Sequence, residues 1–155
     1  MSTANKQTIR ALYDAFSRGD VEAVLSAMTD DVTWECPGGA PYCGRRFGRG
    51  QVRQYFAELD RSVRLDEFDT DEIIEDGDKI VVLGRERATV KESGSLFETA
   101  FAHVFTMRNG KVAEVRLFSD THAAASAFGE STKERQALGG SLGVTHEAYS
   151  GRIRD

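Results

Sequence analysis

The chain has 155 residues, enough for one domain with a sizeable core, and 40% of them are hydrophobic and 29% charged. The formal net charge is −5, and acidic and basic residues alternate without the basic stripe typical of a nucleic-acid-binding protein, so nucleic acid is not an expected partner. No apolar run approaches the length of a membrane span, so we expect no membrane partner either.

The N-terminal residues are amphipathic and lack the apolar core of a secretion signal, so we expect a cytoplasmic protein. Cys36 and Cys43 are the only cysteines, and in a reducing compartment we expect both to be thiols. Two cysteines and three scattered histidines do not form a spaced ligand set. The sequence therefore predicts no metal site, and no cofactor is expected.

The first half of the chain predicts three helices and one short strand. Apolar residues recur at helical spacing over 3–18, and Asp20 can cap a second helix that follows at once. A strand is expected over 32–36, followed by a loop rich in glycine and proline over 37–50. A third amphipathic helix is predicted over 51–63.

The second half predicts an antiparallel meander. A weakly patterned acidic strand over 64–75 turns back into a strand over 80–90, which begins with β-branched residues. A long hairpin begins at Leu96, and a short alanine-rich helix is expected over 122–128. Residues 129–155 are polar with scattered apolar positions, and we interpret them as a partly helical C-terminal tail.

The hairpin is the most informative stretch. Asn109 and Gly110 are typical of a type I′ turn, which needs φ > 0 at both central residues. Counting back from a two-residue turn pairs Met107 with Val112, Phe105 with Glu114, His103 with Arg116 and Phe101 with Phe118. His103 and Asp120 would then share one face of the sheet, with room between them for a small molecule.

Three segments carry a resemblance to a known family: GDVEAVLSAMTDDVTWECPGG, GRGQVRQYFAEL and AHVFTMRNGKVAEVRLFSD. Over residues 5–128 the chain resembles the nuclear transport factor 2-like superfamily, and within it the SnoaL-like polyketide cyclases and their ketosteroid isomerase relatives. The resemblance implies an α+β cone-shaped barrel, in which three helices from the N-terminal half cover the concave face of a strongly curved, mainly antiparallel sheet. It places a SnoaL-like domain at 1–128, followed by the tail at 129–155.

Asp120 and His103 are the predicted catalytic pair. In the cyclases that the chain resembles, the aspartate at the position of Asp120 acts as acid and base, and desolvation at the strand end would raise its pKa for that use. The alternative is that Asp120 caps the following helix through the N–H of Ala123. His103 lies on the apolar face of the hairpin, either as a structural side chain or as a donor to a developing oxyanion.

Other candidates would bind the substrate. The ketosteroid isomerases carry a catalytic aspartate at the position of Cys36, and their tyrosine aligns one residue away from Tyr13, so steroid isomerisation by that mechanism is disfavoured. Cys36 would instead be a pocket-wall thiol or a nucleophile with a lowered pKa. Arg116 would hold a carboxylate or enolate, or else pair with a strand acid. The expected substrate-binding residues are Tyr13, Phe16, Trp34, Cys36, Phe101, Arg116 and Phe118.

Together these features predict an enzyme that works without a cofactor by general acid/base chemistry, as a cyclase, isomerase, hydratase or hydrolase, on a hydrophobic metabolite in a cone-shaped pocket. The alternative is a non-catalytic domain for ligand binding or dimerisation. We also expect a homodimer, because the second face of the sheet would carry Ala102, Val104, Val115 and Leu117 and would need a cover.

Overall fold

The computed structural model describes residues 3–129. Its elements are α1 (Ala4–Ser17), α2 (Val21–Ser26), β1 (Met28–Cys36), β2 (Gly44–Phe47), α3 (Gly48–Ser62), β3 (Val63–Asp76), β4 (Lys79–Val90), β5 (Leu96–Arg108), β6 (Lys111–Ser119) and α4 (Thr121–Ala127). Strand β2 lies inside the segment predicted as a loop, and the predicted tail lies outside the described residues from 130 onward. None of the helices within 3–129 is long and apolar enough to cross a membrane.

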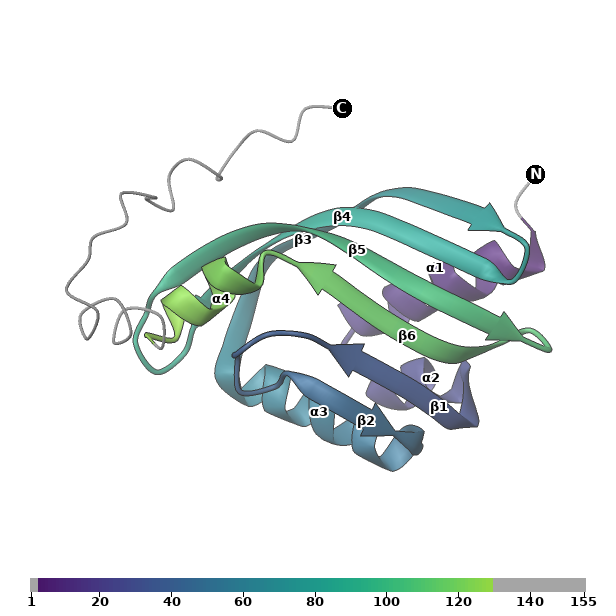
Figure 1. Ribbon diagram of the computed structural model, residues 1–155, viewed down its shortest axis with the longest axis horizontal. Helices are drawn as coiled ribbons and strands as arrows, with labels where there is room; N and C mark the ends of the chain where they lie inside the picture. The colour runs from purple at the N-terminus through teal and green to yellow at the C-terminus, as the bar shows by residue number, and fades with distance from the viewer. Residues whose placement is uncertain (1–2, 130–155) are drawn as a thin grey trace.

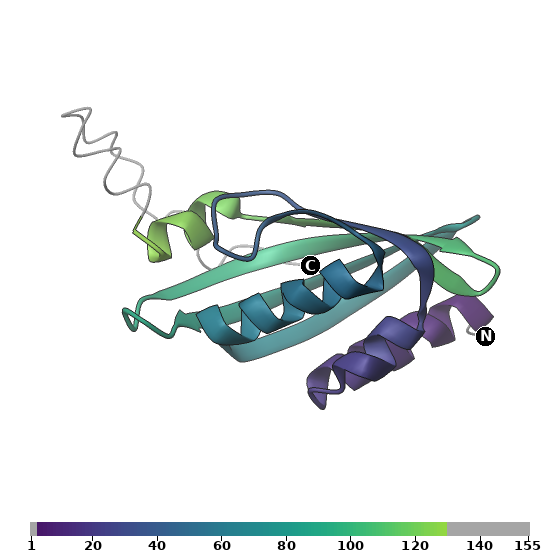
Figure 2. The same ribbon diagram turned by 90° about the horizontal axis from the view of Figure 1, so that it is seen from below.

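The strands form one curved sheet in the order β2-β1-β6-β5-β4-β3. Neighbouring strands are antiparallel except for β1 and β6, which are parallel. Helices α1, α2 and α3 lie on the concave side of the sheet, and α3 crosses in front of the strands when the molecule is seen from below (Figures 1 and 2). The predicted α+β cone with three helices over the concave face is confirmed.

The helices pack on the sheet through the apolar faces that the sequence predicts. Helix α1 buries Ile9, Leu12 and Ala15, and its first turn is capped by the side chain of Thr3. Helix α3 turns Tyr55 and Phe56 inward. These side chains pack against the apolar face of the central strands in one hydrophobic core.

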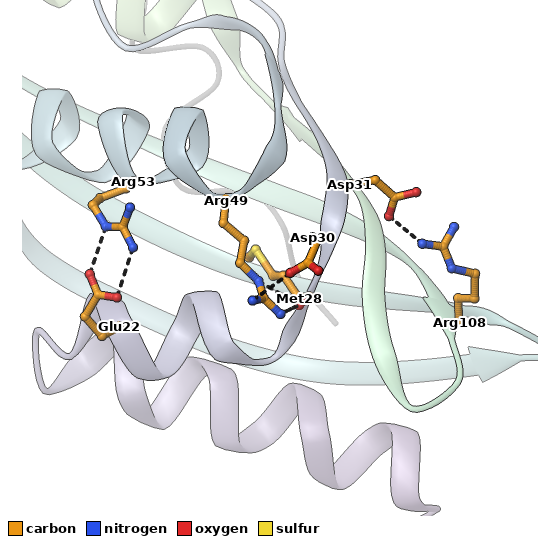
Figure 3. A network of polar contacts seen from close by, with 7 residues as sticks. All are labelled: Glu22, Met28, Asp30, Asp31, Arg49, Arg53 and Arg108. Carbon is orange, nitrogen blue, oxygen red and sulfur yellow. Dashed lines mark hydrogen bonds and ion pairs between the residues drawn. The ribbon is translucent and has the colours of Figure 1, made fainter.

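Arginines of α3 tie this helix to the N-terminal part of the chain (Figure 3). Arg53 donates two hydrogen bonds to the carboxylate of Glu22 on α2, at 2.8 and 3.0 Å. Arg49 donates to the carbonyl oxygen of Met28 at 3.0 Å and pairs with Asp30 at 2.9 Å. Exposed ion pairs contribute little stability one by one, and here they join α3 to α2 and to the start of β1.

The hairpin turn is confirmed, but the predicted register beyond it is wrong. Asn109 and Gly110 have φ values of 53° and 78°, as a type I′ turn requires. A β-bulge then inserts Ala113, so that Met107 pairs with Val112 but Thr106 pairs with Glu114. The following pairs are Phe105 with Val115, Val104 with Arg116, His103 with Leu117, Ala102 with Phe118 and Phe101 with Ser119. One extra residue moves every later side chain of β6 to the other face.

The bulge also corrects the predicted dimer face. Val115 is fully buried, and Leu117 faces the concave side opposite His103. Ala102 and Val104 remain on the convex face, where Phe118 and Arg116 of β6 lie opposite them. The homodimer itself stays a prediction, but it cannot use all four residues that we named.

Replacing Gly84 with alanine should weaken the sheet under the site. A Cβ at Gly84 would lie 2.2 Å from the backbone oxygen of Asp69 and 2.3 Å from Cζ of Phe101, so the strands or the ring must move. We expect a loss of about 1–3 kcal/mol in the free energy of unfolding, measured with urea. Gly50→Ala is the control, because open space surrounds this helical position and alanine favours the helix. Equal midpoints for Gly84→Ala and the wild type would contradict the close packing.

Candidate functional site

A cavity of about 90 Å³ lies between the concave face of the sheet, helices α1 and α3, and the loop that joins β1 to β2. Its wall is mostly aromatic and aliphatic, and the loop contributes backbone around two glycines. The aromatic lining consists of Tyr13, Phe16, Trp34, Tyr42, Tyr55, Phe56, Phe68, Phe97 and Phe105. Such a wall suits a flat, hydrophobic ligand with few polar groups.

Five of the predicted site residues line this cavity. Tyr13 and Phe16 come from α1, Trp34 and Cys36 from β1, and His103 from β5. The predicted helical spacing of α1 and the two-residue period of the strands point these side chains to the concave side. The chain therefore brings together residues that are up to 90 positions apart in sequence.

Three predicted substrate-binding residues do not line the cavity. Arg116 and Phe118 lie on the convex face because of the bulge, where the guanidinium sits 5.1 Å above the Phe118 ring and 4.0 Å from Glu35. Phe101 is buried and does not line the cavity, and its ring stacks on His103 with centroids 4.1 Å apart. We expected Arg116 to contact a ligand beside His103. This expectation is wrong, because Leu117 lies opposite His103 and lines the cavity.

Asp120 caps helix α4, as the alternative interpretation predicts. Its carboxylate accepts a hydrogen bond from the Ala123 N–H at 2.9 Å, and its own N–H donates to Thr99 Oγ1 at 2.8 Å. The neighbours Ser119 and Thr121 line the cavity, whereas Asp120 does not. A role for this carboxylate as a base stays a prediction, and its observed contacts are those of a cap.

Substitutions at Asp120 should therefore act on stability. Asp120→Ala removes the acceptor for the Ala123 N–H, so the free energy of unfolding should fall by about 1 kcal/mol. Asp120→Asn keeps an acceptor and should remain close to the wild type. Urea unfolding of the two variants side by side measures the difference. An equal loss in both variants would mean that the charge, and not the cap, is what the helix needs.

Tyr13 and His103 form an uncharged hydrogen-bonded pair in the wall. The phenol oxygen lies 2.7 Å from Nδ1 of His103. Burial lowers the pKa of His103 to about 3, so the imidazole is neutral near pH 7 and cannot supply a positive charge. Burial, and the nearby charge of Glu86, raise the pKa of Tyr13, so the phenol keeps its proton. The pair can offer a hydrogen bond to a ligand but no charge.

Glu86 on β4 is the functional candidate that sequence reasoning missed. Among the described residues that line the cavity it is the only one with a carboxylate or a cationic side chain. Burial raises the pKa of Glu86 from 4.5 to about 7. Burial, and to a smaller extent the charge of Glu86, raise the pKa of Tyr42, which lines the same cavity.

The sequence pattern of β4 could have identified Glu86, because buried and exposed side chains alternate along this strand. Ile80, Val82, Gly84, Ala88 and Val90 form the buried face of this strand. Position 86 has the same parity, so a glutamate interrupts an otherwise apolar face. An acid at such a position points to a function more strongly than one on a polar face, because burying a carboxylate without a partner costs free energy.

Trp34 adds a polar group to the same wall. Its indole packs against Tyr55 and Phe56, with ring centroids 4.8 and 5.4 Å away. Its Nε1–H is buried without an acceptor among the residues that the structure describes. A buried donor of this kind is suited to a carbonyl oxygen of a ligand. Within 3–129 no three His, Cys, Asp or Glu side chains gather as a metal-binding cluster.

Comparison with known proteins places this geometry in a family. Residues 9–115 match the sequence model of the SnoaL-like domain. An NTF2-like protein of unknown function from Burkholderia pseudomallei K96243 is 30% identical, with a TM-score of 0.77 over 83% of this chain and 99% of that one. An NTF2-like protein from Burkholderia xenovorans LB400 is 28% identical, with a TM-score of 0.76 over 82% and 98%.

A third solved structure contains a ligand. TerC, co-crystallised with polyporic acid, is 30% identical to this chain, with a TM-score of 0.71 over 81% of this chain and 98% of TerC. A search of curated proteins gave no match.

Proposed function

The chain belongs to the SnoaL-like domain family, and we propose that it is an enzyme that moves protons on a hydrophobic small molecule without a cofactor. The observation that carries this proposal is Glu86, a single acid in a cavity otherwise lined by apolar and neutral polar side chains. Because its pKa is about 7, the carboxyl group is present in both protonation states near neutral pH. Such a group can take a proton from a bound molecule and return it elsewhere.

The ligand class follows from the groups around Glu86. A carbonyl compound with an acidic C–H or O–H would give its proton to the Glu86 carboxylate, which becomes a neutral acid. The negative charge that develops on the carbonyl oxygen needs donors that are already in place. The Trp34 N–H is one such donor. The Tyr13 O–H is a second in the tautomer in which Nδ1–H of His103 donates to the phenol oxygen and leaves the O–H for the ligand.

The wall also limits the shape of the ligand. Aromatic rings make up much of the lining, so a flat aromatic or polycyclic carbonyl compound could stack on them and bury apolar surface there. The co-crystal of TerC with polyporic acid supports a small organic ligand for a relative of this fold. The reactions that fit are isomerisation, cyclisation and dehydration, each of which can proceed by moving one proton.

One observation favours a second candidate, a binding domain without catalysis. Asp120 occupies the position of the acid and base in the cyclases that the sequence resembles, yet its carboxylate caps α4 and does not line the cavity. A cavity without a catalytic Asp120 could still bind a hydrophobic molecule. The difference between the candidates lies in whether Glu86 exchanges protons with the bound molecule.

Deuterium exchange tests the proposal without knowledge of the natural substrate. Uncharged aromatic ketones such as 2-tetralone would be incubated with the protein in D2O, and exchange at the acidic C–H followed by NMR. The enzyme should accelerate exchange of at least one ketone, and Glu86→Gln should not. Binding of a ketone with exchange no faster than in Glu86→Gln would favour the binding domain.

A further inference from the structure

Cys36 and Cys43 meet at the wall of the cavity. Cys36 is the last residue of β1 and pairs with Gly44, the first residue of β2, so the ladder brings the adjacent Cys43 to the same point. The two sulfur atoms lie 3.4 Å apart, and both residues line the cavity. Both are thiols and no disulfide joins them. The loop that they enclose is the one that closes the cavity between the two strands.

The two thiols differ in their surroundings. Cys36 is buried, and its S–H donates a hydrogen bond to Sγ of Cys43. This bond, and burial after it, raise the pKa of Cys36, so it stays a thiol. Cys43 is only half-buried, and its S–H donates a hydrogen bond to the Pro37 carbonyl oxygen at 3.4 Å. Because Cys43 is the more exposed of the two, a peroxide reaches its sulfur first, which makes Cys43 the nucleophile of the pair.

We propose that Cys36 and Cys43 are a reversible oxidation site, at which a hydroperoxide converts the two thiols into a disulfide that reshapes the cavity wall. Cys43 first gives its S–H proton to water, and its sulfur then attacks the outer peroxide oxygen. The O–O bond breaks, Cys43 becomes a sulfenic acid, and the leaving oxygen takes up a proton from water and departs as an alcohol or water. The Cys36 sulfur then attacks the sulfur of Cys43. The S–S bond forms as the S–O bond breaks, and the S–H proton leaves with the hydroxyl as water.

The disulfide would change the cavity because its sulfurs belong to the wall. They lie 3.4 Å apart and must approach to the roughly 2.0 Å of a disulfide bond. The movement tightens the loop from Pro37 to Tyr42, both of which also line the cavity. Trp34 lies two residues before Cys36 and is the only tryptophan of the chain, so its fluorescence reports the change. This site rests on the thiol geometry alone and does not depend on the proposed proton transfer.

The test uses the full chain in its reduced form, with hydrogen peroxide as the oxidant. After oxidation the protein is unfolded, alkylated with N-ethylmaleimide and weighed intact by mass spectrometry. We expect a monomer that has lost two hydrogen atoms and takes up no maleimide. After reduction with dithiothreitol, the protein should take up two maleimides, one on each cysteine. The fluorescence of Trp34 should change with the same time course.

Single variants separate the two thiols. In Cys36→Ala the sulfenic acid on Cys43 has no resolving partner, so dimedone should trap it. In Cys43→Ala the buried Cys36 should react much more slowly than the wild type, and neither variant should show the fluorescence change. Retention of two maleimide additions in the wild type, disulfide-linked dimers, or equal peroxide reactivity of Cys43→Ala would overturn the proposal. A disulfide without a fluorescence change would overturn its effect on the cavity.

Discussion

Replacing Glu86 with glutamine should make the protein more stable than the wild type above neutral pH. The native pKa of Glu86 is about 7, against 4.5 for an unperturbed glutamate. The native state therefore binds a proton more tightly than the unfolded chain does, and this contribution is complete below about pH 4.5. It is lost progressively as the pH rises through about 7, where the native carboxyl group must ionise in its apolar surroundings. Glutamine stays neutral throughout.

The size of this effect follows from the pKa difference. A rise from 4.5 to about 7 corresponds to up to about 3 kcal/mol in the free energy of unfolding. Urea unfolding at about pH 5 and about pH 8 measures it, and the gap between Glu86→Gln and the wild type should widen towards the higher pH. Glu72→Gln is the control, because Glu72 is exposed on β3. A constant gap between wild type and Glu86→Gln at both pH values would contradict the burial of an ionisable Glu86.

The same substitution should remove proton transfer. Glutamine keeps the shape of Glu86 but cannot accept a proton, so the exchange rate of a bound ketone should fall by about 10²–10⁴-fold. The wild-type rate should rise with pH through about 7, as the carboxylate form of Glu86 accumulates. Exchange into the ketone at a series of pH values measures both effects.

Asp120→Asn is the control for the loss of exchange in Glu86→Gln. Asparagine keeps the cap on α4 and removes the acid that the sequence resemblance favours as the base. We expect this variant to retain exchange within a few-fold of the wild type. A loss in Asp120→Asn together with full activity in Glu86→Gln would assign the base to Asp120 and contradict the role of Glu86.

Most of the fold could be predicted from the sequence because local patterns decide it. The helical spacing of the apolar residues predicts α1 and α3, and Asn109-Gly110 predicts the hairpin turn. Strand β2 escaped prediction because its four residues, Gly44–Phe47, are mostly exposed and carry no alternation of apolar side chains. Its pairing with β1 comes from tertiary structure rather than from local propensity.

The site was harder to predict, for two physical reasons. The bulge at Ala113 cannot be recognised from the two-residue period of the sequence. It nevertheless exchanges the faces of Arg116 and Leu117, so the predicted site contains an apolar side chain in place of a cation. The contact between Tyr13 and His103 depends on how α1 lies across the sheet, which no local pattern specifies. Glu86 could have been predicted, because it lies on the same face of β4 as the buried residues of that strand.

The most direct test of the role of Glu86 is the NMR titration of its side-chain carboxyl carbon in selectively labelled protein, with Glu86→Gln used to assign the signal. We predict a midpoint at about pH 7, because burial in the cavity disfavours the carboxylate. A ligand that occupies the cavity should also shift this signal. A midpoint near 4.5, the value of a solvated glutamate, would contradict the central claim that Glu86 is poised to exchange protons at neutral pH.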